Sequence, residues 1–248
     1  MHFNPYVYRV ALQAGLTLAC SFPFVLVAAW HSPTRRWGVL LLVASLVVLD
    51  AALVEIPRVD GFQRHHWSWQ ESLLSSAWPF LVVALIPGIS LATIGVTSRF
   101  RSGWLRPSIV AGLVALAVPA VFFVLGARRK LDREGWAFLL IMPGLAEELV
   151  FRGVYQSLLN GVFGKPWRLA NAEFGWGLVI TAILFAGFNG LVSVDSQLHA
   201  RIVLHAAIAP FMLSLVSGWI RECADSVWPS VIGHNLSNII IPVASLFA

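Results

Sequence analysis

The sequence predicts an all-α, polytopic integral membrane protein with about eight transmembrane helices. Of its 248 residues, 58% are hydrophobic and only 12% are charged, whereas an ordinary soluble domain carries about 25% charged residues. The mean hydropathy is +0.78. The apolar residues occur in runs of about 20, the length that an α-helix needs to cross a bilayer. Because helices satisfy their own backbone hydrogen bonds in hydrocarbon, runs this long favour helices over the shorter strands of an outer-membrane barrel.

The polar breaks between apolar runs give the expected spans in chain order. They lie near Tyr8–Trp30, Trp37–Ile56, Leu73–Gly95, Pro107–Leu125, Ala137–Leu159, Trp176–Val192, Ile202–Ile220 and Trp228–Phe247. These spans leave no room for a sizeable soluble domain, so we expect a single membrane domain over residues 1–248. Its N-terminal spans, within residues 1–135, have no assigned role.

The first four spans carry few polar signals. The first run follows Arg9, and it is too long for a signal peptide and lacks a clear small-residue cleavage site before His31, so we interpret it as a retained span. Asp50 and Glu55 fall near the end of the second span and are assigned no role. Prolines inside several spans predict kinks, because neighbouring helices can satisfy the freed carbonyls: Pro23, Pro79, Pro87, Pro119, Pro143 and Pro210.

The charge distribution indicates a membrane surface rather than nucleic acid. The net charge is +5, but the basic residues form short clusters in the loops, such as Arg99 with Arg101 and Arg128-Arg129-Lys130. Clusters of this kind are typical of membrane-surface anchors. The two sets of loops carry equal numbers of Lys and Arg, so the count gives no orientation. The two cysteines, Cys20 and Cys223, are distant in the chain and form no disulfide framework.

The fifth span contains three ionisable residues, Glu147, Glu148 and Arg152, in an otherwise apolar run. Each costs about 2.5 to 3.5 kcal/mol at a helix centre, so the three side chains should face the bundle interior or water. Arg152 follows Glu148 at the i, i+4 spacing that favours a salt bridge. Glu147 is turned about 100° away from Glu148 and points elsewhere. These three residues form either a catalytic site or a buried ion pair that only joins helices, with the extra glutamate near the headgroup boundary.

Two later spans add polar residues. His234 and Asn238 stand at i, i+4 on one face of the last span, where an imidazole and an amide can orient water and donate hydrogen bonds to an oxyanion. They could equally be an ordinary interhelical polar contact. Asn189 ends the sixth apolar run and, with Gly190, also has the pattern of a simple turn.

Together these residues resemble the CAAX protease and bacteriocin-processing family of intramembrane glutamic endopeptidases. The matching motifs are Glu147-Glu148-x-x-x-Arg152, Phe185-x-x-x-Asn189 and His234-x-x-x-Asn238, with Gly218-Trp219-Ile220-Arg221 and Ser226-Val227-Trp228-Pro229 ahead of the last one. The resemblance covers residues 136–248. It implies a peptidase without a covalent intermediate, in which Glu147 activates water, Glu148 and Arg152 hold the site together, and His234 and Asn238 polarise the scissile carbonyl.

The chain departs from this family in its second motif, which normally ends in histidine and here ends in Asn189. Asparagine can position water but cannot accept a proton. Three outcomes are open: Glu147 acts alone as the base, His199 or His205 takes the place of the missing histidine, or the protein is an inactive relative. Glutamate, histidine and asparagine could also bind zinc, but zinc sites usually draw three or more ligands from Cys, His and carboxylate, and no HExxH occurs. We expect no cofactor and no metal ligand.

The leading hypothesis is thus an intramembrane endopeptidase that cleaves a membrane-bound or lipid-proximal substrate, such as a prenylated tail, a leader or a sorting peptide. The expected partners are that substrate and the lipid bilayer, without nucleic acid, and the expected location is multi-pass in a bacterial inner (cell) membrane. One alternative is an inactive relative that binds peptides as an immunity or chaperone protein. Another is a proton-coupled transporter that uses Glu147 and Glu148 as a relay, although no inverted repeat is visible.

Overall fold

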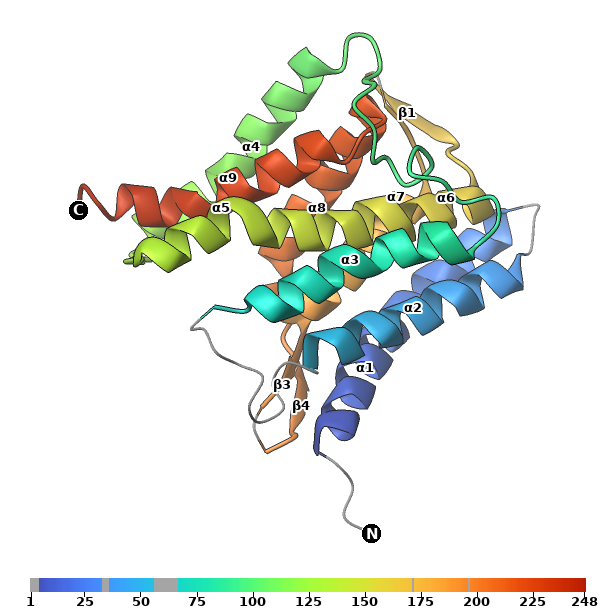
Figure 1. The fold of residues 1–248 in the computed structure, drawn as a ribbon, viewed down its shortest axis with the longest axis horizontal. Coiled ribbons are helices and arrows are strands. Elements are labelled where there is room, and N and C mark those ends of the chain that lie inside the picture. Colours follow the sequence, from blue (N-terminus) through green and yellow to red (C-terminus); the bar gives the residue numbers. More distant parts are fainter. Residues whose placement is uncertain (1–4, 33–35, 56–66, 171, 196) are drawn as a thin grey trace.

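The computed structural model describes residues 5–32, 36–55, 67–170, 172–195 and 197–248, and it is all-α in character (Figure 1). Its helices are α1 (Pro5–His31), α2 (Trp37–Glu55), α3 (Trp69–Leu85), α4 (Leu105–Val124), α5 (Arg133–Glu148), α6 (Gln156–Phe163), α7 (Trp176–Ala186), α8 (Leu204–Ala224) and α9 (Trp228–Ala244). Two π-helical segments continue them: η2 (Leu149–Tyr155) joins α5 to α6, and η3 (Gly187–Leu191) extends α7. When α5–η2–α6 and α7–η3 are each counted as one continuous helix, the described residues form eight helices. This number matches the eight predicted spans and confirms the fold class.

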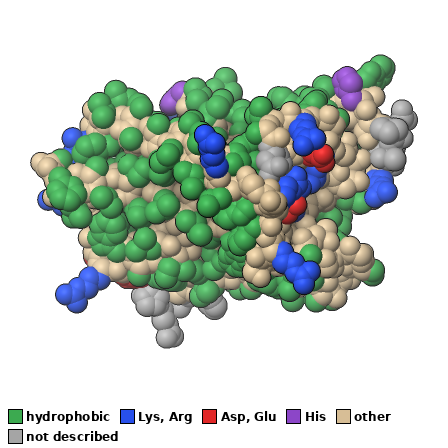
Figure 2. Space-filling model, turned by 90° about the horizontal axis from the view of Figure 1, so that it is seen from above, with side chains coloured by type: hydrophobic (Ala, Val, Ile, Leu, Met, Phe, Trp, Pro, Cys, Tyr) green, Lys and Arg blue, Asp and Glu red, His purple; other side chains and the backbone are tan. Residues whose placement is uncertain are grey.

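Four helices among the described residues, α1, α2, α4 and α8, are long and apolar enough to cross a membrane by length and composition, and α7 with η3 forms a shorter apolar helix. Hydrophobic side chains cover most of the face that Figure 2 shows, and basic and acidic side chains gather toward one end of that face. An apolar surface of this kind suits contact with lipid rather than water. The chain is therefore a polytopic membrane protein.

Three predicted boundaries differ from the structure, one by ten residues and the other two by one or two. The third span ends at Leu85, well before Gly95, because Ile86 adopts an extended conformation ahead of Pro87, as residues before proline generally do. Val192 and Ile202, predicted to end the sixth span and to begin the seventh, instead pair with each other in a hairpin. The predicted end of the second span, Ile56, lies outside the described residues.

Two short antiparallel hairpins interrupt the helices. Strands β1 (Trp167–Leu169) and β2 (Ala172–Phe174) pair between α6 and α7. Strands β3 (Val192–Val194) and β4 (Ala200–Ile202) pair between η3 and α8. Each strand has only three residues, too few for a periodicity argument to separate it from a helix end.

The C-terminal helices surround the polar residues, and the N-terminal helices support them from one side. α5 packs against α9 and α3, α7 packs against α8, α6 and α1, and α4 packs against α8 and α9. In Figure 1, α2, α3 and the α5–η2–α6 helix run in similar directions, whereas α4 crosses them steeply. Only Ser108 and Pro119 are buried on α4, so much of the surface of this helix is exposed.

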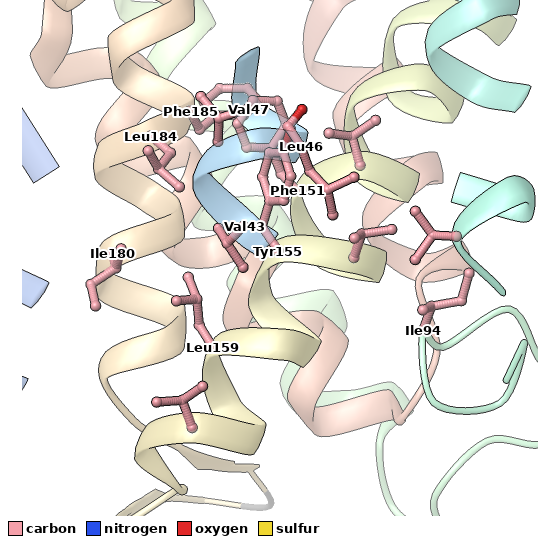
Figure 3. Packing of buried hydrophobic residues seen from close by; sticks show 14 of the residues in the cluster. Val43, Leu46, Val47, Ile94, Phe151, Tyr155, Leu159, Ile180, Leu184 and Phe185 are labelled. Carbon is pink, nitrogen blue, oxygen red and sulfur yellow. The ribbon is translucent and has the colours of Figure 1, made fainter. Parts of the chain in front are cut away.

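The main hydrophobic cluster fills the space between α2, η2, α6 and α7 (Figure 3). Phe151 is its aromatic centre, with edge-to-face contacts to Tyr155 at 5.4 Å and to Phe185 at 5.1 Å between ring centroids. The Tyr155 hydroxyl donates to the carbonyl oxygen of Leu46 at 3.1 Å. Such van der Waals packing is the main force that associates helices in lipid, and here it holds the π-helical segment η2 in place.

A buried polar junction ties α6 to α8 at one end of the bundle. The Glu222 side chain is fully buried and accepts hydrogen bonds from Gln156 Nε2 at 2.6 Å, Asn160 Nδ2 at 2.9 Å and Lys165 Nζ at 2.5 Å. Arg221 Nη1 also lies 3.3 Å from the same carboxylate. A buried carboxylate needs partners of this kind to offset the loss of its hydration.

Candidate active site

The predicted ion pair on the fifth span is present, and it is completely buried. Arg152 Nε donates to Glu148 Oε2 at 3.0 Å, and neither side chain is exposed to solvent. The pair straddles the junction of α5 with the π-helical segment η2, whose wider turn carries Arg152. Single π-helical turns occur frequently at functional sites, because they reorient side chains within an otherwise regular helix.

A glycine and an asparagine bring α5 and α9 unusually close together. Asn235 Oδ1 accepts from the Gly144 backbone N–H at 2.7 Å, and Asn235 Nδ2 donates to the Ile141 carbonyl at 3.2 Å. A Cβ atom at Gly144 would stand 2.5 Å from the Val231 carbonyl oxygen and 2.6 Å from Asn235 Oδ1. Only glycine fits such an approach. Sequence reasoning missed Asn235, although it directly follows His234.

This close approach sets His234 against the acidic pair. Its Nδ1 lies 2.9 Å from Glu148 Oε1, and because an ionised carboxylate only accepts hydrogen bonds, Nδ1 carries the hydrogen. The ring packs edge-on against Phe185, with 6.0 Å between centroids. The Glu148 carboxylate thus joins Arg152 and His234, and the second ring nitrogen of His234 remains available to a ligand.

Glu147 occupies a different position from Glu148, as the helical spacing predicted. Its side chain is half-buried, and Asn189 Nδ2 lies 3.4 Å from Glu147 Oε2 and 3.2 Å from the Phe185 carbonyl oxygen. The η3 segment that carries Asn189 is held by α1, where Gln13 Nε2 donates to the Gly187 carbonyl at 3.0 Å. Asn189 can therefore orient the Glu147 carboxylate, but it cannot take a proton from it.

A cavity of about 350 Å³ collects all six of the residues that the motifs singled out. Its lining includes Glu147, Glu148, Arg152, Asn189, His234 and Asn238. The terminal nitrogens of Arg152 have no hydrogen-bond partner within the described part of the chain. The same holds for the hydroxyl of Ser214, a further lining residue that is buried on α8. Nothing in the sequence pattern of α8 marked Ser214.

His199 and His205 do not line this cavity. His199 lies in the β3–β4 hairpin, where its backbone N–H and that of Gln197 donate to Asp195 Oδ1 at 2.9 Å. The hydrogen bond from the His199 backbone, and then that from Gln197, hold the pKa of the Asp195 carboxyl below its usual range. His205 is exposed in the first turn of α8. Neither ring is positioned to replace the histidine that the second motif lacks.

Asp50, which had no assigned role, is buried on α2, where it faces α3. Its Oδ1 accepts from Ser75 Oγ at 2.9 Å and from Trp78 Nε1 at 3.0 Å. Among the described residues, no group of three or more His, Cys, Asp or Glu side chains is arranged to hold a metal ion. The cavity therefore presents carboxylate, imidazole, guanidinium and amide groups to a ligand.

Comparison with known proteins gives one family match. Residues 133–240 match the family described as "Type II CAAX prenyl endopeptidase Rce1-like", which confirms the resemblance predicted from the motifs. No curated protein and no solved structure matched the chain. The matched segment runs from the first residue of α5 into α9 and includes each of the six motif residues. Over these residues the chain is similar to the type II CAAX prenyl endopeptidase (Rce1-like) family.

Proposed function

We propose that this protein is an intramembrane endopeptidase that hydrolyses a peptide bond in a membrane-associated substrate by glutamate-activated water. The observation that carries the proposal is the single cavity that Glu147, Asn189, His234 and Asn238 line together. A cavity of about 350 Å³ falls at the small end of the usual range for ligand sites, which suits a short extended peptide. The N-terminal helices belong to the same membrane domain and support the site through α1 and α3.

In the first step, a water molecule binds between Glu147 and the scissile carbonyl. The Glu147 carboxylate takes a proton from this water as the hydroxide attacks the carbonyl carbon. Asn189 holds the carboxylate by its amide, 3.4 Å from Oε2. Because Asn189 cannot accept a proton, Glu147 is the base in this scheme and later returns the proton to the leaving nitrogen.

In the second step, His234 and Asn238 donate hydrogen bonds to the oxyanion of the tetrahedral intermediate. Since His234 Nδ1 donates to Glu148, its Nε2 can donate to the oxyanion only when the ring is doubly protonated. The Glu148 carboxylate stabilises that imidazolium form, and Arg152 keeps Glu148 ionised and fixed. Removing one such donor typically costs about 10²–10³ in turnover. Collapse of the intermediate releases a carboxylate and an amine.

Asn189 also motivates a second candidate, an inactive relative that binds a hydrophobic peptide in the same cavity. Such a protein would retain the cavity but would lack a base strong enough to activate water. An Asn189→His variant separates the two candidates, because it restores the missing proton acceptor at an exposed position.

The test is cleavage of a panel of tail, leader and sorting peptides by the purified protein in liposomes. Wild type, Glu147→Gln and Asn189→His are compared, each with and without a metal chelator. Cleavage by wild type that is lost in Glu147→Gln and survives chelation supports the peptidase. Full activity in Glu147→Gln would refute it, and cleavage by Asn189→His alone would establish the inactive relative. The same proposal includes a bacterial inner membrane as the location, which fractionation of the source cells tests.

A further inference from the structure

A second cavity lies between α4, α8 and the β1–β2 hairpin. It is an open groove of about 770 Å³, larger than the active-site cavity of about 350 Å³. On α4, Arg106, Val110 and Val114 line it on successive turns, a stretch of about 12 Å at the rise of an α-helix. Val216 of α8 lines both cavities, so the inner end of the groove reaches the wall of the candidate active site.

The groove has one charged end and a hydrocarbon interior. Arg106, the only charged residue that lines it, is exposed at the first turn of α4 and has no ion-pair partner within the described ranges. The rest of the lining is apolar apart from the indole N–H of Trp219, which is buried and has no hydrogen-bond partner among the described residues. Because peptide groups left unpaired in such surroundings cost several kcal/mol each, this lining selects an alkyl chain over a polypeptide.

The two polar groups lie near the same end of the bundle. The Arg101 backbone N–H donates to the Ala224 carbonyl at 3.1 Å, which joins the start of α4 to the C-terminal end of α8. Trp219 is five residues before that end of α8 and Arg106 is one residue into α4. An anionic group at Arg106, an acceptor beside Trp219 and an alkyl chain running inward reproduce the order of phosphate, ester and acyl chain in a phospholipid.

We propose that this groove binds one anionic phospholipid, with its phosphate at Arg106, an ester carbonyl at the Trp219 indole N–H and one acyl chain between α4 and α8. The net charge of +5 favours anionic over zwitterionic lipid. The bound chain would fill the flank of α4, whose own contacts bury little of it, and would close the wall beside Val216. The proposal concerns lipid binding and does not depend on peptidase activity.

The test is retention of lipid by the full-length protein after detergent exchange, measured by native mass spectrometry with phosphatidylglycerol and phosphatidylcholine added in equal amounts. Wild type should retain one phosphatidylglycerol in preference to phosphatidylcholine. Arg106→Gln should reduce that preference about five-fold, the effect of one basic residue near an anionic surface. Trp219→Phe, which removes the N–H together with part of the indole ring, should weaken retention of both lipids, and Ala111→Phe, which fills the groove, should abolish it.

Matched controls are Arg99→Gln, an exposed arginine that does not line the groove, and Ala117→Phe, an exposed alanine elsewhere on α4. Both should behave as wild type. Equal retention of the two lipids by wild type, or equal effects of Arg106→Gln and Arg99→Gln, would overturn the proposal, because the groove would then hold bulk lipid without selection. Displacement of all phospholipid by a lipid-modified peptide would also overturn it, since the groove would then be a substrate subsite.

Discussion

The imidazole Nδ1 of His234 lies 2.9 Å from one carboxylate oxygen of Glu148, and Arg152 Nε lies 3.0 Å from the other. One buried carboxylate therefore contacts an imidazole and a guanidinium that come from different helices. Glu147, the adjacent residue, also lines the cavity but takes no part in this pairing. This division separates a residue needed for stability from a residue proposed for chemistry.

Glu148→Gln should destabilise the protein strongly, whereas Glu147→Gln should not. Loss of the Glu148 charge leaves the Arg152 guanidinium buried without a counter-ion, which costs about 3–5 kcal/mol. Glu147 is half-buried and has only the long contact from Asn189, so its replacement by an isosteric amide should change stability by less than about 1 kcal/mol. Unfolding in detergent measures both variants, and equal destabilisation would contradict this division of roles.

Gly144→Ala should impair the site without touching any charged group. The new Cβ would stand 2.5 Å from the Val231 carbonyl oxygen and would push α9 away from α5, lengthening the His234–Glu148 contact. We expect at least a ten-fold loss of peptide cleavage and a lower melting temperature, since overpacking typically costs about 1–3 kcal/mol. Gly161→Ala is the control, because a Cβ there meets nothing within 4 Å. A similar loss in that variant would contradict the claim that the close approach of α5 and α9 sets the site.

Glu222→Gln should be far more damaging than Asp225→Asn, although both remove a carboxylate near the end of α8. Glu222 is fully buried and accepts from three side chains besides Arg221, so its loss should cost about 3–5 kcal/mol. The Arg101–Asp225 pair is partly exposed, at 31% and 45% of its side chains, and such pairs contribute less than about 1 kcal/mol. Chemical unfolding of the two variants in one detergent compares them directly.

Acid should loosen the β3–β4 hairpin before it affects the helices. The pKa of Asp195 is lowered from 3.8 in the folded hairpin, so its hydrogen bonds add stability that is complete above the unfolded pKa and is lost as the pH falls through the folded pKa. Hydrogen exchange of the peptide 192–202 should therefore be constant near neutral pH, after correction for intrinsic rates, and should rise below about pH 4. In Asp195→Ala, exchange should be fast at every pH; an acid-dependent step that persists in this variant would assign the titration to another group.

The sequence alone determined the fold class, the number of helices and six of the residues that line the cavity. Run length and hydropathy suffice for the helices, because hydrocarbon forces each span to satisfy its own backbone. Charged residues in such runs are equally visible, since burying them is costly and needs a partner. The i, i+4 spacing even identified Arg152 as the partner of Glu148.

The tertiary structure decided what local periodicity does not encode. The contact of His234 with Glu148 joins residues 86 positions apart and depends on Gly144 and Asn235, which bring α5 and α9 together. His199 is kept out of the cavity by the β3–β4 hairpin, whose strands are too short to leave a sequence signal, and His205 is exposed in the first turn of α8. The orphaned hydroxyl of Ser214 and the groove at Arg106 likewise arise only where separate helices meet, because a cavity is a property of packing between elements and not of any one element.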